Sequence, residues 1–247
     1  MQDAKLKQIS FAFEVPNLMG ADDYIVTDCN KTAFSMVQKW PNWPNKGLVV
    51  YGPEGCGKSH LAHLLAEKIK QQTQQLNCVA ILNSAQVKMN CVPKLAETYQ
   101  HLIVENLMQK VDNEALFHLF NIYQDEPNRS ILWTAHVAPN QIHFSLKDLQ
   151  SRLNMLPCVA IERPDDKMMQ MIVVKLFNDR QLMISPEILE YIVVYAKRSF
   201  SYIQKLVEEI DAVSLAYHMS VNHFVVKKAM ELVDTKEDKQ RDLFDEW

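Results

Sequence analysis

Glycine is scarce in this chain. Only five of its 247 residues are glycine, whereas an average composition of about 7% would give about 17. Three of the five, Gly52, Gly55 and Gly57, lie in one short stretch. Glycine is needed where the backbone adopts positive φ or closely approaches another group. The scarcity therefore directs attention to this one loop.

Other absences exclude several classes of protein. No apolar run approaches the ~20 residues that span a bilayer, and the N-terminus lacks the pattern of a signal peptide. The cysteines are odd in number and contain no C-x-x-C pair, which predicts reduced thiols in a cytoplasm rather than a disulfide or zinc framework. The net charge of −4 argues against strong non-specific DNA binding, and we expect no direct sequence-specific DNA binding and no membrane partner. With 48% hydrophobic and 23% charged residues, the composition is that of a soluble globular protein.

The glycine-rich stretch forms a complete G-x-x-x-x-G-K-[ST] motif. Its residues are Gly52, Pro53, Glu54, Gly55, Cys56, Gly57, Lys58 and Ser59. The apolar run 48–51 precedes it and a helical stripe from Leu61 follows it, so the motif has the strand–loop–helix context of a phosphate-binding loop. The backbone N–H groups and the helix N-terminus attract phosphate. Lys58 is predicted to reach the β- and γ-phosphates, and the Ser59 hydroxyl to hold Mg²⁺.

The remaining pattern predicts an α/β fold. Apolar segments at 79–82, 102–104, 131–134 and 159–161 lack alternation and are typical of strands buried on both faces. With helical spacing between them, they predict a three-layer αβα domain around a five-stranded parallel sheet. After Pro164 only helical stripes follow, which predicts a small helical lid. We therefore divide the chain into an N-terminal segment 1–20, the αβα domain 21–163, the lid 164–233 and a flexible, charge-rich tail 234–247.

Three motifs carry a resemblance to a known family. The run 57–61, Gly-Lys-Ser-His-Leu, resembles the G-K-T-H-L of the bacterial replication initiator DnaA and its relatives among the AAA+ ATPases. The segment 23–26 with Asn30 resembles the part of that family that lies beside adenine. The segment 148–153 is similar to the family's box VII, whose Ser-Arg pair carries an arginine finger. The resemblance covers about residues 8–233.

This resemblance implies a nucleotide site and a catalytic arginine. It places ADP or ATP with Mg²⁺ beside Tyr24, Ile25 and His60, and it makes Arg152 the finger. In the initiator, a helix-turn-helix DNA-binding domain follows this module. A family member without that domain resembles the Hda type, and the stretch 40–44, Trp-Pro-Asn-Trp-Pro, is similar to a segment of that type. Proteins of that type act on the replicase sliding clamp and cause DnaA to hydrolyse its ATP. The implied partners are therefore the sliding clamp and DnaA, with self-association into a homodimer left open.

Two short segments match clamp-binding peptides, which bind in extended form with apolar anchors in a pocket. The N-terminal candidate consists of Gln8, Ile9, Ser10, Phe11 and Phe13. The C-terminal candidate follows the bacterial pentapeptide Q-x-[SD]-L-F and consists of Gln240, Asp242, Leu243 and Phe244. The alternative for the first is an initial strand whose two phenylalanines pack on the core. If both bind, a ring of identical pockets would gain avidity from them.

The sequence departs from an active ATPase at three places. In the acidic strand 101–106, Glu105 can serve the metal, but Asn106 stands where a second acid would activate water and cannot act as a base. His136 stands where relatives often carry aspartate. Ser201 stands at the expected sensor-2 arginine, which leaves Arg198 as the nearest substitute. These changes predict a protein that binds nucleotide but hydrolyses it poorly.

Three functions remain open from the sequence. The first is a regulatory activator that donates Arg152 to ATP bound by DnaA. The second is an autonomous DnaA-like ATPase or loader, against which Asn106 argues. The third is a clamp-tethered binding module with no catalytic role. For Arg152 itself, the alternative is an ion pair with a carboxylate of its own subunit.

Overall fold

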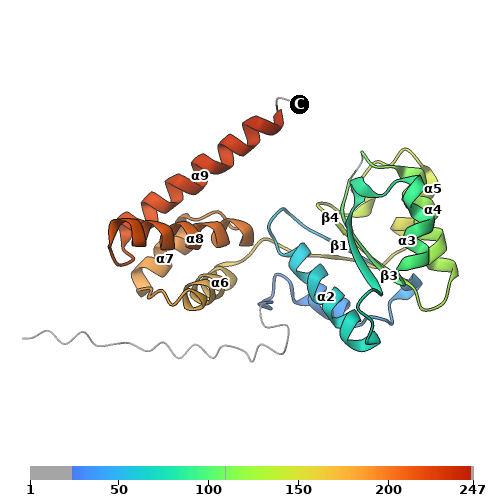
Figure 1. Ribbon diagram of the computed structural model, residues 1–247, viewed down its shortest axis with the longest axis horizontal. Coiled ribbons are helices and arrows are strands. Elements are labelled where there is room, and N and C mark those ends of the chain that lie inside the picture. Colours follow the sequence, from blue (N-terminus) through green and yellow to red (C-terminus); the bar gives the residue numbers. More distant parts are fainter. Residues whose placement is uncertain (1–23, 109, 246–247) are drawn as a thin grey trace, which may run out of the picture.

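The computed structural model describes residues 24–108 and 110–245 and is built around a parallel sheet of five strands. The strands run in the order β2-β3-β4-β1-β5 (Figure 1). Their bounds are Gly47–Tyr51 (β1), Val79–Asn83 (β2), His101–Leu107 (β3), Ser130–Ala135 (β4) and Cys158–Ala160 (β5). Each strand coincides with one of the five predicted apolar segments, to within a few residues. The predicted five-stranded parallel sheet is therefore confirmed.

Helices cover both faces of this sheet. On one face lie α1 (Lys31–Gln38) and α2 (Lys58–Thr73), and on the other lie α3 (Val92–Thr98), α4 (Asn113–Asp125) and α5 (Lys147–Asn154) (Figure 1). The side chains of β1 alternate between these layers: Leu48 and Val50 pack toward α2, and Val49 packs toward α4. Because both faces are buried, an unbroken apolar run is the correct sequence for this strand. Four short 3₁₀ helices complete this part: Pro44–Lys46, Ser84–Gln86, Met89–Cys91 and Pro139–Gln141.

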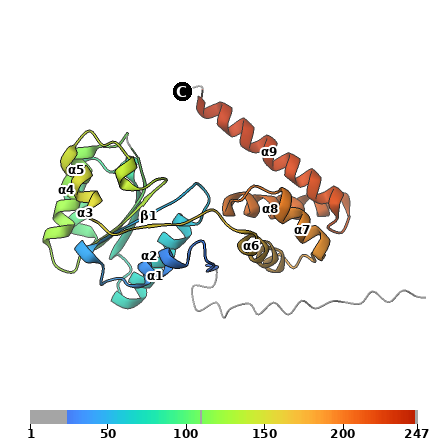
Figure 2. The ribbon, with the colours of Figure 1, turned by 180° about the vertical axis from the view of Figure 1, so that it is seen from behind.

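The last four helices form a second lobe with a core of its own. They are α6 (Asp166–Asp179), α7 (Pro186–Tyr195), α8 (Phe200–Tyr217) and α9 (His223–Asp245). Among the described residues, the chain passes from the sheet to these helices after β5, as the view from behind shows (Figure 2). Asp165, Ser185 and Ser199 cap α6, α7 and α8, each accepting a hydrogen bond from a backbone N–H in the first turn. Buried residues such as Phe177, Ile192 and Leu206 fill the core between these helices.

One sequence expectation concerns the end of the chain. The sequence predicts a flexible tail from residue 234 onward, and in the structure α9 continues to Asp245. The helix gives the secondary structure of this segment, and its flexibility stays a prediction. Residues 223–245 contain neither glycine nor proline, the two residue types that most disfavour a helix, and their charged residues include four lysines and four aspartates. High charge alone therefore does not end this helix.

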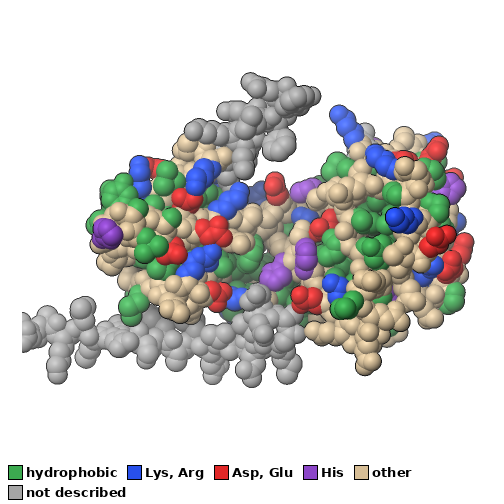
Figure 3. Space-filling view, in the orientation of Figure 1, with side chains coloured by type: hydrophobic (Ala, Val, Ile, Leu, Met, Phe, Trp, Pro, Cys, Tyr) green, Lys and Arg blue, Asp and Glu red, His purple; other side chains and the backbone are tan. Residues whose placement is uncertain are grey.

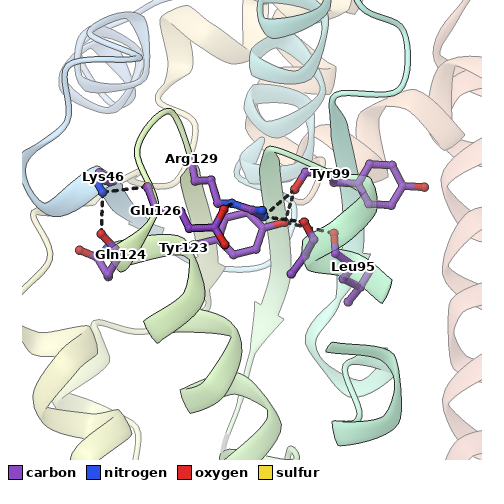
Figure 4. Close-up of polar contacts among 8 residues, drawn as sticks. Lys46, Leu95, Tyr99, Tyr123, Gln124, Glu126 and Arg129 are labelled. Carbon is purple, nitrogen blue, oxygen red and sulfur yellow. Dashed lines mark hydrogen bonds and ion pairs between the residues drawn. The ribbon is translucent and has the colours of Figure 1, made fainter. Parts of the chain in front are cut away.

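Polar contacts tie together the loops at the amino end of the sheet (Figure 4). The Arg129 guanidinium donates to the carbonyls of Ala96 and Tyr99, pairs with Glu126 at 2.6 Å and lies 5.0 Å from the centre of the Tyr123 ring. The Lys46 ammonium donates to the carbonyls of Gln124 and Glu126. These cations donate hydrogen bonds to backbone carbonyls that have no partner within the helix where α3 and α4 end, and their charge is favourable at helix C-termini. The candidate functional site lies at the opposite end of the sheet, where the strands have their carboxyl ends.

A buried histidine at this amino end makes stability depend on pH. His101 is buried, its Nδ1 lies 2.9 Å from the Ser130 hydroxyl, and its ring meets the edge of Trp40. Burial, together with the charge of Arg129, lowers the pKa of His101 to about 4. The unfolded chain therefore takes up this proton near pH 6.5 and the folded chain only near pH 4. Between these values falling pH is expected to remove up to about 3 kcal/mol of stability.

This effect can be isolated with His101→Gln, which does not titrate. We expect the free energy of urea unfolding to fall more steeply in the wild type than in the variant between about pH 7 and about pH 5. Carboxylates titrate equally in both proteins, so their contribution cancels in the comparison. Identical pH dependence of the two proteins would contradict the assignment.

Candidate phosphate-loop site at the sheet edge

The glycine motif forms a tight loop between β1 and α2. The Gly52 N–H donates to the Ala135 carbonyl at 3.1 Å, and a Cβ at Gly52 would lie 2.2 Å from the Ile161 carbonyl oxygen. Gly57 has φ +99° and immediately precedes the first residue of α2. Side chains are thus excluded from the first position by space and disfavoured at the second by backbone conformation. This arrangement directs the N-terminus of α2 toward the loop, as anion binding requires.

The loop surrounds the ammonium group of Lys58. Lys58 is buried, and its Nζ donates to the carbonyls of Gly52 and Pro53, each at 2.7 Å. The neighbouring Cys56 is also buried, and burial raises the pKa of its thiol. The only formal charge this pair contributes at neutral pH is therefore the lysine cation. Ser59, the next residue of α2, is exposed with its hydroxyl at the start of the helix.

The segment 24–30 connects the loop to the helical lobe. The Asn30 side chain accepts from the Thr27 N–H and donates to the Ile25 carbonyl, which closes a compact turn. Tyr24 packs in the core on the α2 side, whereas Ile25 packs in the core of the second lobe. The Tyr24 ring stacks on Phe34 and meets the edge of His60. The structure thus brings Tyr24, Ile25 and His60 to the junction between the lobes, near the phosphate loop.

Tyr24 also carries a polar atom that the described residues leave unsatisfied. Its hydroxyl is buried and has no hydrogen-bond partner among them. Burial raises the pKa of this phenol, so the group stays neutral and can donate a hydrogen bond. An unpaired buried hydroxyl costs free energy, which a polar ligand group could recover.

The N-terminus of α8 rests directly on the phosphate loop. The Phe200 N–H donates to the Gly55 carbonyl at 2.8 Å, and the Phe200 ring lies 5.7 Å from the ring of His60. A Cβ at Gly55, where φ is +70°, would lie 1.9 Å from the Ser199 hydroxyl oxygen and 3.2 Å from that of Ser201. Glycine is therefore required at position 55 for the lid to contact the loop. The sequence pattern gave no signal for this contact, because Ser199 and Phe200 belong to no motif.

The three residues expected at the sensor positions, Ser201, Arg198 and His136, have different surroundings. Ser201 does lie beside the loop, where a sensor-2 side chain would be, and its hydroxyl pairs with that of Ser199 at 2.9 Å. The Arg198 guanidinium turns away toward the Asp166 carboxylate and the Pro164 carbonyl. Its expected role as a substitute cation for the phosphates stays a prediction. His136 is exposed just past the end of β4.

The acidic strand ends in a bulge. Val104 pairs with Trp133 and Leu107 with Ala135, so Glu105 and Asn106 together face the single residue Thr134. One carboxylate oxygen of Glu105 is buried and has no hydrogen-bond partner in the described residues. An orphaned carboxylate oxygen, at the end of the sheet where the first turn of α2 carries Ser59, is the chemistry that a hydrated Mg²⁺ ion requires, so the residues present fit this cation. Asn106 supplies no second acid.

Arg152 occupies a separate surface. It lies in the last turn of α5, whose Leu149 and Leu153 are buried in the core on the face of the sheet opposite α2. The Arg152 side chain is exposed, and no described residue forms an ion pair or a hydrogen bond with it. The alternative of a carboxylate partner on its own subunit thus finds no support in the described part of the chain.

The two peptide candidates cannot be placed in this site. Gln8, Ile9, Ser10, Phe11 and Phe13 lie outside the described residues. Gln240, Asp242, Leu243 and Phe244 belong to the backbone of α9, but their side chains are outside the described part. On the face shown in Figure 3, basic and acidic side chains are interspersed over both lobes. None of the helices within the described ranges is long and apolar enough to cross a membrane.

Comparison with known proteins identifies a family match. Residues 17–159, more than half of the chain, match the family model described as the bacterial DnaA ATPase domain. The chain is 24% identical over 181 residues to the chromosomal replication initiator protein DnaA of Buchnera aphidicola subsp. Baizongia pistaciae, covering 66% of this chain and 39% of that protein. It is 33% identical over 121 residues to DnaA of Ruegeria sp. TM1040, covering 43% of this chain and 24% of that protein. The chain thus spans less than half the length of these relatives.

Solved structures show the same fold. Domain III of the Thermotoga maritima replication initiation protein DnaA superposes with a TM-score of 0.73 at 17% identity, covering 84% of this chain and 93% of that one. The replication initiator DnaA bound to AMPPCP and single-stranded DNA gives a TM-score of 0.63 at 17% identity, covering 85% and 79%. AMPPCP-bound DnaA from Aquifex aeolicus gives 0.66 at 19% identity, covering 92% and 70%.

Proposed function

This chain belongs to the family of the bacterial DnaA ATPase domain, and from that membership we propose that it is a nucleotide-bound regulator of replication initiation. In this proposal it is an AAA+ protein of the Hda type, acting in the cytoplasm. It docks on the replicative sliding clamp and promotes hydrolysis of the ATP that DnaA holds. It does so by supplying Arg152 in trans.

Its own nucleotide is ADP or ATP. Two of the structural neighbours are complexes with the adenine nucleotide analogue AMPPCP, which supports an adenine nucleotide here. The phosphates would lie in the loop around Lys58, and Tyr24 and Ile25 would lie beside the base. Mg²⁺, held by the Ser59 hydroxyl and through water by Glu105, would neutralise phosphate charge. The buried Tyr24 hydroxyl and Glu105 oxygen, both unpaired in the described residues, would then gain partners.

A weak or absent ATPase activity of its own follows from the same site. Asn106 cannot take a proton from water, so the strand edge offers one acid where hydrolysis needs two. Arg198, which could have placed a second cation on the phosphates, is already paired with Asp166. The bound nucleotide would therefore have a structural and regulatory role.

The observation that carries the proposal is the exposed side chain of Arg152 on α5, which pairs with none of the described residues. An arginine inserted into a neighbouring active site stabilises the charge that develops on the transferred phosphoryl group. Arg152 lies on the face of the sheet opposite α2, so it is better placed to serve another subunit's phosphates than its own. Its planar, permanently charged guanidinium suits this role better than a lysine would.

Docking on the clamp would use one or both terminal peptides. The C-terminal peptide lies in the helical end of α9, so binding in extended form requires the last turns of this helix to unwind. Exposed helix ends fray at little cost in free energy, which permits this unwinding for a short peptide. The N-terminal peptide requires no change in the described elements. A homodimer, in which Arg152 faces a second copy, is a competing use of the same arginine.

The test is hydrolysis of DnaA-bound ATP in the presence of clamp loaded on DNA. We expect phosphate release to accelerate when this protein is added, and the acceleration to require the clamp. Variants with Gln8→Ala and Phe11→Ala, or with Leu243→Ala and Phe244→Ala, show which peptide docks. No acceleration despite confirmed clamp binding would favour a tethering role. Robust turnover by the protein alone would favour an autonomous ATPase.

A further inference from the structure

The backbone of Asn106 has an unusual conformation. It adopts φ +57°, in the left-handed region, at the bulge where it and Glu105 face Thr134. Non-glycine residues rarely adopt this conformation, and asparagine is among those that tolerate it best. Bulges next to functional sites change the direction of the side chains on the bulged strand. The asparagine therefore has a backbone explanation that does not require its amide to act as a base or as a metal ligand.

Two buried hydroxyls hold this conformation from both sides. The Asn106 N–H donates to Thr134 Oγ1 at 3.2 Å, and the Ser84 hydroxyl donates to the Asn106 carbonyl at 2.6 Å. Ser84 and Thr134 are fully buried, and they come from the ends of the strands on either side of β3. The bulge breaks the regular ladder between β3 and β4, so its peptide groups need these partners. The backbone of Asn106 is thus held by hydrogen bonds to the Ser84 and Thr134 side chains.

These two hydrogen bonds affect Glu105, the one acid of the site. Glu105 directly precedes Asn106, pairs in register with Asn83 of β2, and has a buried carboxylate oxygen without a partner in the described residues. If the bulge were lost, the residues after Val104 would shift register by one, and side chains would exchange faces of the sheet. The direction of the Glu105 carboxylate therefore depends on the conformation of Asn106.

We propose that Asn106 is a positioning residue: its left-handed backbone, held by Ser84 and Thr134, directs the Glu105 carboxylate toward the Mg²⁺ ion of the bound nucleotide. The inference rests on the proposed nucleotide site. It also makes the buried Thr134 hydroxyl, which accepts from the Asn106 N–H, part of the structure that positions Glu105.

The experiment measures Mg²⁺ affinity in the presence of a fluorescent ADP analogue, with analogue affinity in EDTA as a separate readout. Thr134→Val removes the hydroxyl and nearly keeps the shape of the side chain, whereas Thr134→Ser keeps the hydroxyl. We expect Thr134→Val to weaken Mg²⁺ binding about 10-fold or more, as loss of an outer-shell partner does. Analogue affinity in EDTA should stay unchanged, and Thr134→Ser should behave as the wild type.

A pair of substitutions at position 106 separates backbone from side chain. Asn106→Gly removes the amide but keeps access to positive φ, so Mg²⁺ affinity should be retained. Asn106→Val, which is β-branched, should lose it. The control is Ser130→Ala, which removes a buried hydroxyl at the other end of the same sheet, where it bonds Trp40 and His101.

The outcomes are distinct. Equal loss in Asn106→Gly and Asn106→Val would overturn the inference, because it would show that the amide itself acts. Unchanged Mg²⁺ affinity in Thr134→Val would overturn it as well, while leaving the nucleotide site intact. Failure of the wild-type protein to bind the analogue at all would overturn the proposed nucleotide site, and this inference with it.

Discussion

Alanine at position 152 is expected to abolish the stimulation of DnaA-bound ATP hydrolysis. An arginine finger supplied in trans typically contributes about 10³–10⁵ in rate, or about 4–7 kcal/mol of transition-state stabilisation. Arg152 is exposed, and its side chain has no partner among the described residues, so its removal breaks no contact within the described structure. Single-turnover release of phosphate from DnaA, with clamp loaded on DNA, measures the loss. Nucleotide binding and clamp binding by the variant should be unchanged.

Two further variants sharpen this expectation. Lys147→Ala removes an exposed cation from the other end of the same helix, α5, and should leave stimulation intact. Arg152→Lys keeps the charge but loses the planar fork of donors, and should retain only a small part of the stimulation. Equal losses for Lys147→Ala and Arg152→Ala would indicate a general electrostatic attraction between the partners. Wild-type stimulation by Arg152→Ala would exclude the finger.

The layers of the fold could be predicted from the sequence because they follow from local patterns. The segments that form β1 and β4 contain the apolar runs 48–50 and 131–133 without alternation, which a sheet covered on both faces can bury. The glycine motif sits between such a run and a helical stripe, so the pattern alone locates its loop between a strand and a helix. The need for glycine at position 52, by contrast, comes from close approach to the Ile161 carbonyl, which lies far along the chain.

Features that depend on distant contacts were beyond sequence reasoning. Contact between Gly55 and the N-terminus of α8 joins residues far apart in the chain, and no motif marks it. The same holds for the two hydrogen bonds that hold the Asn106 backbone, because Ser84 directly follows β2 and Thr134 belongs to β4, on either side of β3. The sequence presents Asn106 only as a missing base, whereas its φ shows a second constraint. The helical end of α9 is not predicted from the sequence, because its high charge indicates the end of the helix although no glycine or proline follows.

Lys58→Ala is expected to cause the largest loss of nucleotide affinity. The ammonium is the one cation within the loop, and its two hydrogen bonds to Gly52 and Pro53 hold it at the position that phosphate oxygens would approach. Removing a buried, hydrogen-bonded charge from a binding site costs about 2–4 kcal/mol, which corresponds to weaker nucleotide binding by about 30- to 1,000-fold. Fluorescence titration with a labelled ADP measures it.

The matched control is Lys68→Ala, on the same helix α2. Lys68 is also partly buried and donates to the backbone and side chain of Gln38, but it lies on the outer part of the helix, away from the phosphate loop. It should lower stability slightly and leave nucleotide affinity unchanged. If Lys58→Ala binds nucleotide as the wild type does, the loop is structural only. If Lys58→Ala fails to bind nucleotide but still stimulates DnaA, the nucleotide is dispensable, and Arg152 acts from a fold that needs no ligand to present it.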